Sequence, residues 1–241
     1  MVACTPALFG DLPQAEPVVA QNAIAIEPEP FALTVQVIPS GEQVVEVRVA
    51  SSQSLPTPPT AQIWQAGADE ALPASLTYHA AEDLYIGHAT LNAELERRGA
   101  IQVDAIDGSS RTMRRIQEFA LKPVQAALFT PNLASPDGNF DLVLSEGALT
   151  ADAYLSIHAV TVNAGDPGGR VRASQSYHVA LSTGQEQLNA PAVVNLRYRV
   201  EELYGVAEQS LRLYRWADEH QQWVSAGAGD VHPERQMVST T

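Results

Sequence analysis

The chain has 241 residues, and its 28 acidic and 14 basic side chains give a formal net charge of −14. This length suits two domains of ordinary size better than one, and no apolar run approaches the roughly 18 residues needed to cross a bilayer. Because an acidic field repels phosphate backbones, we expect no nucleic-acid binding. The lack of a long apolar run predicts no membrane span. Cys4 is the only cysteine, which excludes an intrachain disulfide and a cysteine-rich metal site.

Residues 1–30 predict an acidic, Pro-rich lead-in or tether. Residues 5–30 contain five prolines, and no basic residue precedes Arg48. This composition favours an extended segment over a helix. Residues 18–26, "VVAQNAIAI", alternate as an edge strand does and are a candidate for pairing with a neighbouring domain or subunit. The start "MVAC" is not a signal peptide as it stands, and Cys4 fits a chance cysteine better than the stump of a lipoprotein cleavage site.

Residues 31–123 predict an immunoglobulin-like or fibronectin-like β-sandwich. Short runs of alternating apolar and polar residues are separated there by clusters of Pro, Gly, Ser and Asp, as such a sandwich requires. The runs are "FALTVQVI", "QVVEVRVA", "TAQIWQA", "ASLTYHA", "LYIGHATLN", "GAIQVDAID" and "RTMRRIQEFAL". In the second run Val45 and Val47 share one face, and Glu46 and Arg48 share the other, which is typical of an antiparallel sheet with one buried face.

Residues 124–241 predict a second β-sandwich, and Pro123 marks the expected boundary because strand pairing fails at proline. The strand-like runs are "AALFT", "NFDLVLS", "AYLSIHAVTV", "RVRASQSYHVALS", "AVVNLRYRV", "SLRLYRW", "QQWVSAG" and "QMVST". Residues 210–226 among them predict a C-terminal tryptophan hairpin. The predicted fold class is all-β, with two tandem antiparallel β-sandwich domains, immunoglobulin- or fibronectin-like, behind an extended N-terminal segment.

Three stretches carry a resemblance to known modules. "SPDGNFDLVLSEGALTADAYLSI" and "LNAPAVVNLRYRVEELYGVAEQSLRLYRWADEHQQW" resemble the sandwich modules near the C-terminal ends of large secreted bacterial surface proteins, which are related in pattern to the ZU-type sandwich. "LYIGHATLNAELERRGAIQVDAIDGSS" is similar to the late strands of bacterial immunoglobulin-like repeats. The resemblance implies a structural or adhesive role at an extracellular or cell-surface location, and it supplies no catalytic residues.

Asp137, Asn139 and Asp141 have the spacing that opens an EF-hand calcium loop. However, Leu142 stands where that loop requires Gly, and Ala148 stands where it requires a bidentate Glu. "SPDGNFD" therefore predicts a tight turn before a strand, with calcium binding as the less favoured alternative. We expect no cofactor.

Two other groups of candidate metal ligands also fit structural roles better. Asp104 and Asp107 have room to share an ion, but "DAIDGSS" is foremost a hairpin turn. The six histidines are not spaced to hold one metal from a single element. Since no HExxH, GxSxG or recognisable carboxylate pair occurs, the sequence predicts no enzyme.

The arginines form pairs along the predicted strands. Arg170 with Arg172, and Arg197 with Arg199, are two residues apart, so each pair is expected on one strand face, and Arg212 follows the same pattern. Neighbouring strands would then carry a stripe that binds sulfate, uronic acid or an acidic partner. The alternative, which we favour, is cross-strand pairing of these arginines with Glu and Asp.

Trp216 and Trp223 flank the turn of the predicted hairpin. Cross-strand aromatic packing would close the hairpin and staple the second sandwich. Stacking of an exposed tryptophan on carbohydrate is the alternative.

The sequence therefore predicts a non-catalytic structural or adhesive module of an extracellular or cell-surface bacterial protein, acting as a spacer or in subunit assembly. One alternative is a carbohydrate-binding accessory region of a secreted enzyme, with the tryptophans and arginines as contacts. Another is a self-assembling filament or surface-layer subunit that uses terminal strand exchange. The expected partners are other domains of a larger protein or copies of the chain itself, with glycans under the first alternative.

Overall fold

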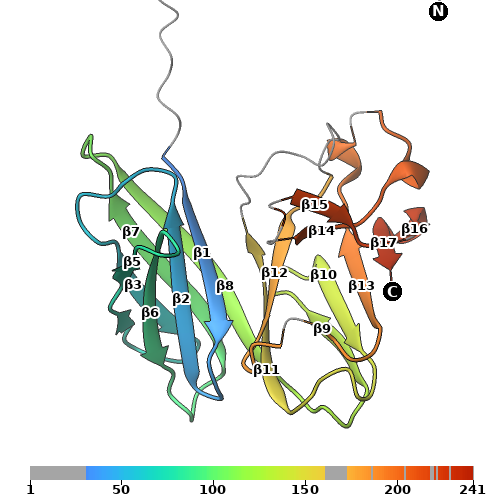
Figure 1. The fold of residues 1–241 in the computed structure, drawn as a ribbon, viewed down its shortest axis with the longest axis horizontal. Helices are drawn as coiled ribbons and strands as arrows, with labels where there is room; N and C mark the ends of the chain where they lie inside the picture. Colours follow the sequence, from blue (N-terminus) through green and yellow to red (C-terminus); the bar gives the residue numbers. More distant parts are fainter. Residues whose placement is uncertain are drawn as a thin grey trace, which may run out of the picture. The chain divides into compact units, whose positions relative to one another are not determined.

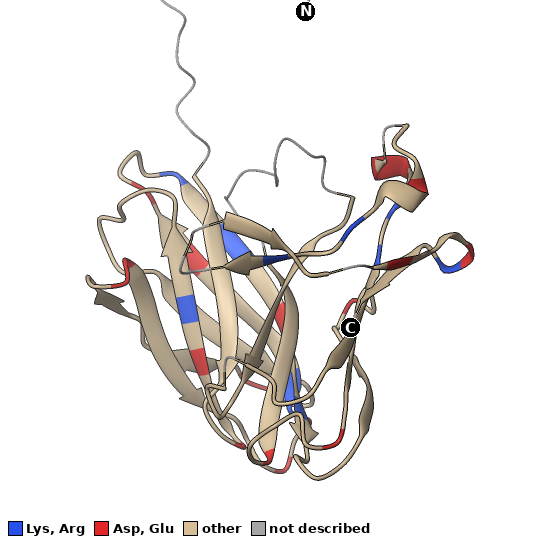
Figure 2. Ribbon diagram, turned by 45° about the vertical axis from the view of Figure 1, so that its right-hand side comes forward, with Lys and Arg blue, Asp and Glu red and all other residues tan. Residues whose placement is uncertain are grey.

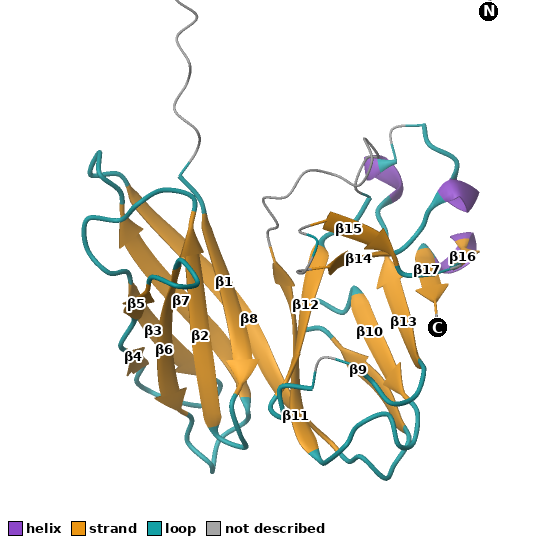
Figure 3. Ribbon diagram, viewed as in Figure 1, coloured by secondary structure: helices purple, strands orange, loops and turns teal. Residues whose placement is uncertain are grey.

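The described part of the chain is all-β, with antiparallel sheets joined by loops and a few short 3-10 turns (Figures 1 and 3). The structure is a computed structural model that describes residues 31–160, 173–185, 187–203, 205–217, 220, 222–227 and 229–240. The lead-in with Cys4, including residues 18–26, lies outside these residues. Among them no helix is long and apolar enough to span a bilayer.

The first half of the chain contributes one complete sheet with the order β1-β2-β6-β5. Its strands are β1 (Leu33–Pro39), β2 (Val44–Ser51), β6 (Leu84–Thr90) and β5 (Thr77–His79). Strict alternation places every second side chain of β1 and β2 in the core, where Val37, Val45 and Val47 are fully buried. The apolar face turns inward because its burial is the main favourable term in folding.

A six-stranded sheet with the order β12-β11-β8-β7-β3-β4 runs through both halves. Its strands are β12 (Ser176–Leu181), β11 (Ala153–Val160), β8 (Thr112–Val124), β7 (Arg98–Ile106), β3 (Thr60–Gln65) and β4 (Leu72–Ala74). The long strand β8 pairs with β7 over residues 112–120 and with β11 over residues 121–124. Consequently, a single strand joins the two halves.

Pro123, the expected boundary, lies within β8 opposite Tyr154 of β11. The β7–β8 ladder ends where Arg98 pairs with Ala120, before Pro123. The missing N–H of Pro123 therefore removes no hydrogen bond from the β7–β8 ladder, and β8 can continue through this residue. Phe31–Thr241 form one compact unit. The division at 123 stays a prediction, although separate apolar cores lie on either side of it.

The second half adds a five-stranded sheet with the order β16-β17-β13-β10-β9. Its strands are β16 (Asp230–His232), β17 (Met237–Thr240), β13 (Ala192–Arg197), β10 (Phe140–Leu144) and β9 (Thr130–Ala134). Three 3-10 turns, η2 (Val200–Glu202), η3 (Glu208–Ser210) and η4 (Pro233–Arg235), lie in the connections. Since β17 lies between β13 and β16, a donated strand from another copy has no open position beside β13.

Strand β11 is buried on both faces. Leu155 and Ile157 belong to the second core, whereas the alternate residues Ser156 and His158 contact the first half. Ser156 Oγ donates to the Val37 carbonyl at 2.7 Å, and the Val37 N–H donates to His158 Nε2 at 3.3 Å. These bonds satisfy backbone groups on the free edge of β1, which would otherwise be costly to bury.

The seven predicted runs of the first half overlap β1, β2, β3, β5, β6, β7 and β8, whereas the short strand β4 was not predicted. Predictions for the second half were less accurate. Leu128 and Phe129, placed in a predicted strand, lie exposed before β9, and the short strand β16 was not predicted. The predicted hairpin is present as β14 (Tyr214–Ala217) and β15 (Gln222–Ser225), shorter than the expected span.

Candidate functional site

A large cleft lies beside the tryptophan hairpin. It has a volume of about 1640 Å³, compared with roughly 300–1,000 Å³ for a typical small-molecule site. Both halves of the chain line it: Thr34, Gln36, Ile38, Arg48, Ala50 and Glu82 from the first, with Tyr177, His178, Tyr198, Arg212, Tyr214, Arg215, Trp216 and Trp223 among those from the second. Its size suits an extended ligand rather than a small molecule.

The outer face of β1 and β2 forms the wall from the first half. Gln36 lies opposite Arg48 in this strand pair, so both side chains point away from the core toward the cleft. Arg48 Nε is 2.5 Å from Glu46 Oε1, and Arg48 Nη1 is 3.8 Å from Glu82 Oε2. Two carboxylates therefore balance the charge of Arg48, and this wall offers mainly neutral hydrogen-bonding groups.

Trp216 and Trp223 stand opposite each other in the β14–β15 hairpin. Their ring centroids are 5.4 Å apart with an interplanar angle of 74°, an edge-to-face arrangement that aromatic pairs prefer. Both rings are half-buried and line the cleft. The same pair therefore packs across the strands and presents aromatic surface to the cleft.

The hairpin is anchored at its base. Leu213 and Ala217 are buried, and the Ala226 N–H donates to the Leu213 carbonyl at 2.9 Å. Leu213 packs with Tyr198 and Val238 in a small apolar cluster. This cluster packs the base of the hairpin against the five-stranded sheet and so fixes the position of the aromatic wall.

Two tyrosines of the cleft are fixed by carboxylates. Tyr177 donates to Asp137 Oδ2 at 2.6 Å, and Tyr198 donates to Glu208 Oε2 at 2.5 Å. Burial, followed by the Glu208 hydrogen bond, raises the pKa of Tyr198 to about 12. Burial and the Asp137 bond likewise raise the pKa of Tyr177. Both phenols stay protonated near neutral pH and keep their donor roles.

Arg212 and Arg215 are the basic residues of the second wall. Arg212 Nη1 donates to the carbonyls of Gln209, at 3.0 Å, and Leu211, at 2.6 Å. Arg215 is exposed on β14. Within the part of the chain that the structure describes, neither guanidinium has a carboxylate oxygen within 4.0 Å.

The other arginines of the expected stripe are placed differently. Arg199 lies beyond the end of β13 because the chain turns into η2, and it pairs with Glu202 at 3.0 Å. Arg197 Nη1 donates to the Arg235 carbonyl at 3.3 Å. Neither lines the cleft, whereas Arg212 of the expected stripe does. Arg170 and Arg172 lie outside the described residues.

The "SPDGNFD" segment is a tight turn, with Gly138 at a φ of 71°. Asp137 accepts hydrogen bonds from Ser135 Oγ, Tyr177 and the backbone and side chain of Asn139. Burial alone would raise its pKa, but these bonds outweigh burial and lower it. Asp141 instead accepts from Asn195. In the described residues no three His, Cys, Asp or Glu side chains group as metal ligands.

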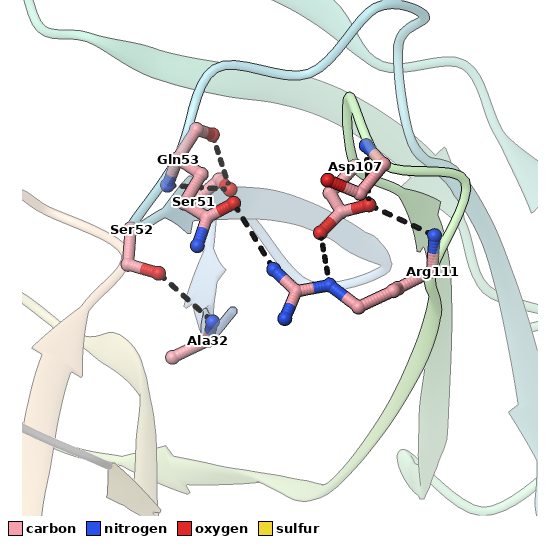
Figure 4. Close-up of polar contacts among 7 residues, drawn as sticks. Ala32, Ser51, Ser52, Gln53, Asp107 and Arg111 are labelled. Atoms are coloured by element: carbon pink, nitrogen blue, oxygen red, sulfur yellow. Dashed lines mark hydrogen bonds and ion pairs between the residues drawn. The ribbon is translucent and has the colours of Figure 1, made fainter. Parts of the chain in front are cut away.

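Asp104 and Asp107 serve separate arginines. Arg111 Nε donates to Asp107 Oδ2 at 2.6 Å, and Arg114 Nε lies 2.6 Å from Asp104 Oδ1. Figure 4 shows Asp107 and Arg111 facing each other, with Arg111 also reaching Gln53. Burial would raise the pKa of Asp107, but the Arg111 bonds lower it. Asp107 stabilises the turn of the β7–β8 hairpin, and Asp104 forms a cross-strand ion pair with Arg114.

His178 lines the cleft, and its ring lies 5.3 Å from that of fully buried His158 on the opposite strand. Burial, and then His178, lower the pKa of His158 to about 3, so its ring is neutral near pH 7. In that form Nε2 accepts the Val37 N–H and Nδ1 carries the proton. His158 therefore bonds to β1 of the first half, next to the cleft residue His178.

Sequence reasoning identified three cleft residues, Arg212, Trp216 and Trp223, and missed Arg48, Arg215 and the tyrosines. The alternation of β2 placed Arg48 on an outer face, but nothing in the sequence indicated that β12 and the hairpin lie opposite that face. Comparison with known proteins adds nothing further, since no family model, curated protein or solved structure matches the chain.

Proposed function

We propose that this protein is a non-catalytic adhesive module of an extracellular or cell-surface protein, built from tandem immunoglobulin-like sandwiches, whose cleft binds an extended carbohydrate. The observation that carries the proposal is the cleft of about 1640 Å³ with both hairpin tryptophans in its wall. The apolar C–H faces of sugar rings pack well on aromatic rings.

The polar groups of the cleft also suit a sugar chain. Thr34, Gln36 and Ser176 provide neutral donors and acceptors along the walls, which is how specific hydrogen bonds orient a ligand in a mostly apolar site. Among the described lining residues, Glu82 is the one carboxylate. The tyrosine hydroxyls are held by Asp137 and Glu208, so the walls are preorganised.

The test is isothermal titration of the full chain with soluble neutral and charged polysaccharides. We expect saturable binding to at least one polymer, and Trp223→Ala should weaken it about tenfold or more, since buried aromatic anchors dominate interfaces. Trp64→Ala is the matched control, because Trp64 is 46% exposed on β3 and does not line the cleft. No binding by any polymer, or equal losses in both variants, would contradict the proposal.

A spacer role is the second candidate. It is supported by the continuity of β8 through both halves and by the bonds from Ser156 and His158 to Val37. These contacts favour a stiff unit that sets a fixed distance between attached domains. If the chain bound no carbohydrate and both halves unfolded in a single cooperative transition, the spacer role would replace the adhesive one.

A further inference from the structure

The proposed carbohydrate site contains two arginines that no carboxylate of the described residues balances. Most arginines in the described ranges have a carboxylate within 4.0 Å, as Arg97 has Glu42 and Arg114 has Asp104. Arg212 and Arg215, both in the cleft wall, do not. The chain has a net charge of −14, so two arginines without a described carboxylate partner at one aromatic wall give this site a local positive charge on an acidic protein.

The geometry of Arg212 leaves a defined edge available. Both of its hydrogen bonds use Nη1, and both acceptors are backbone carbonyls. Nε and Nη2 make no hydrogen bond to any described residue. Those two nitrogens form the planar fork that binds a carboxylate through two parallel hydrogen bonds.

The opposite wall does not supply the missing negative charge. Arg48 is already paired with Glu46 and lies 3.8 Å from Glu82, so both carboxylates face a cation of their own wall. Figure 2 shows the acidic and basic positions of the described residues spread over the ribbon rather than gathered on one side. A ligand with negative groups would therefore be recognised locally, within the cleft.

We propose that the cleft is specific for a carboxylate-bearing polysaccharide, that is, a chain containing uronic acid, with Arg212 and Arg215 binding the carboxylates and Trp216 and Trp223 packing on the sugar rings. This inference rests on the proposed carbohydrate-binding function and names its ligand class. A uronic acid polymer carries a carboxylate on each repeating sugar. Separate carboxylates can therefore bind Arg212 and Arg215 while the sugar rings pack on the tryptophans. Long-range repulsion by the acidic surface is screened within about 8 Å at physiological ionic strength, whereas direct charged hydrogen bonds persist.

The probes are polygalacturonate and the same polymer with its carboxylates methyl-esterified, titrated calorimetrically into the full chain at about 150 mM salt. We expect the esterified polymer to bind at least about tenfold more weakly, since hydrogen bonds to charged groups exceed neutral ones. Arg215→Gln and Arg212→Gln should each weaken binding to polygalacturonate by about tenfold. Arg98→Gln is the matched control, because Arg98 pairs with Glu96 and does not line the cleft.

The outcomes separate this inference from the proposed function. Equal binding of both polymers, with the Arg212 and Arg215 variants unaffected and Trp223→Ala impaired, would overturn the carboxylate assignment and keep the carbohydrate site. Absence of binding to every polysaccharide would overturn both. Polyglutamate bound as tightly as polygalacturonate would show that the ligand is an acidic polypeptide, and tighter binding of dextran sulfate would contradict the choice of carboxylate. Arg215→Gln is expected to fold normally, because Arg215 is exposed on β14 and has no ion pair with any described residue.

Discussion

The β1–β2 strand pair and the segment from Tyr198 to the tryptophan hairpin differ in how their sequences encode structure. In β1 and β2 apolar and polar residues alternate without a break, and the inward valines are fully buried. From residue 198 onward, short strands alternate with 3-10 turns, and the large side chains are half-buried. The regular region supplies much of the buried core and one wall of the cleft, whereas the irregular region supplies the tryptophans, Arg212 and Arg215.

Phe119→Ala should give the largest loss of stability. Phe119 is 1% exposed in the first core, and replacing a buried Phe by Ala typically costs about 3 to 5 kcal/mol. Urea denaturation measures the effect. A loss below about 1 kcal/mol would mean that the first core is not the stable element we infer.

Acid should weaken the junction between the two halves of the chain through His158, which accepts the Val37 N–H. Its pKa is about 3 in the folded protein, whereas an unfolded histidine titrates near 6.5. Between these values the unfolded chain binds a proton that the folded one excludes, so stability falls as the pH drops. From pH 7 to 4.5 the expected contribution is about 2 to 3 kcal/mol.

The control for this acid effect is His158→Gln. Glutamine offers a neutral acceptor for the Val37 N–H and cannot be protonated in this range. Urea denaturation at both pH values should therefore show a smaller acid loss in the variant than in the wild-type chain. An identical pH dependence in the two would place the acid sensitivity elsewhere.

Trp223→Ala should cost the protein less stability than Phe119→Ala, about 1 to 2 kcal/mol, because its ring is half-buried and loses mainly the edge-to-face contact with Trp216. Thermal unfolding followed by far-UV circular dichroism measures the loss. A cost of about 3 to 5 kcal/mol, as for a core residue, would support the stapling role expected from the sequence over the ligand-facing one.

Ser156→Ala should have the smallest effect of these changes, about 1 kcal/mol, since it removes one hydrogen bond, to the Val37 carbonyl. Ser182→Ala is a useful comparison, because Ser182 Oγ accepts from the Tyr154 N–H within the second half rather than between the halves. If Ser156→Ala had no effect on urea denaturation, the Val37 edge of β1 would need another partner, such as water.

The regular strands could be predicted because the period-two pattern reflects burial on one face, and β2 and β7 follow it residue by residue. The junction could not be predicted, because "AYLSIHAV" alternates Tyr, Ser and His as a solvent-exposed face would, whereas in the structure that face is buried against β1. By contrast, Trp216 and Trp223 could be identified from the predicted hairpin alone. The role of Arg48 and Arg215 depends on strands that meet only in the folded chain.

The most direct measurement is tryptophan fluorescence of a Trp64→Phe variant titrated with polygalacturonate. The chain has three tryptophans, and Trp64 is the one outside the hairpin, so the emission of this variant comes from Trp216 and Trp223. We predict a saturable change in emission and protection from acrylamide quenching, both lost in Arg212→Gln/Arg215→Gln. Unchanged emission and quenching at polymer concentrations that saturate calorimetric binding, or no binding at all, would contradict a carbohydrate site in this cleft.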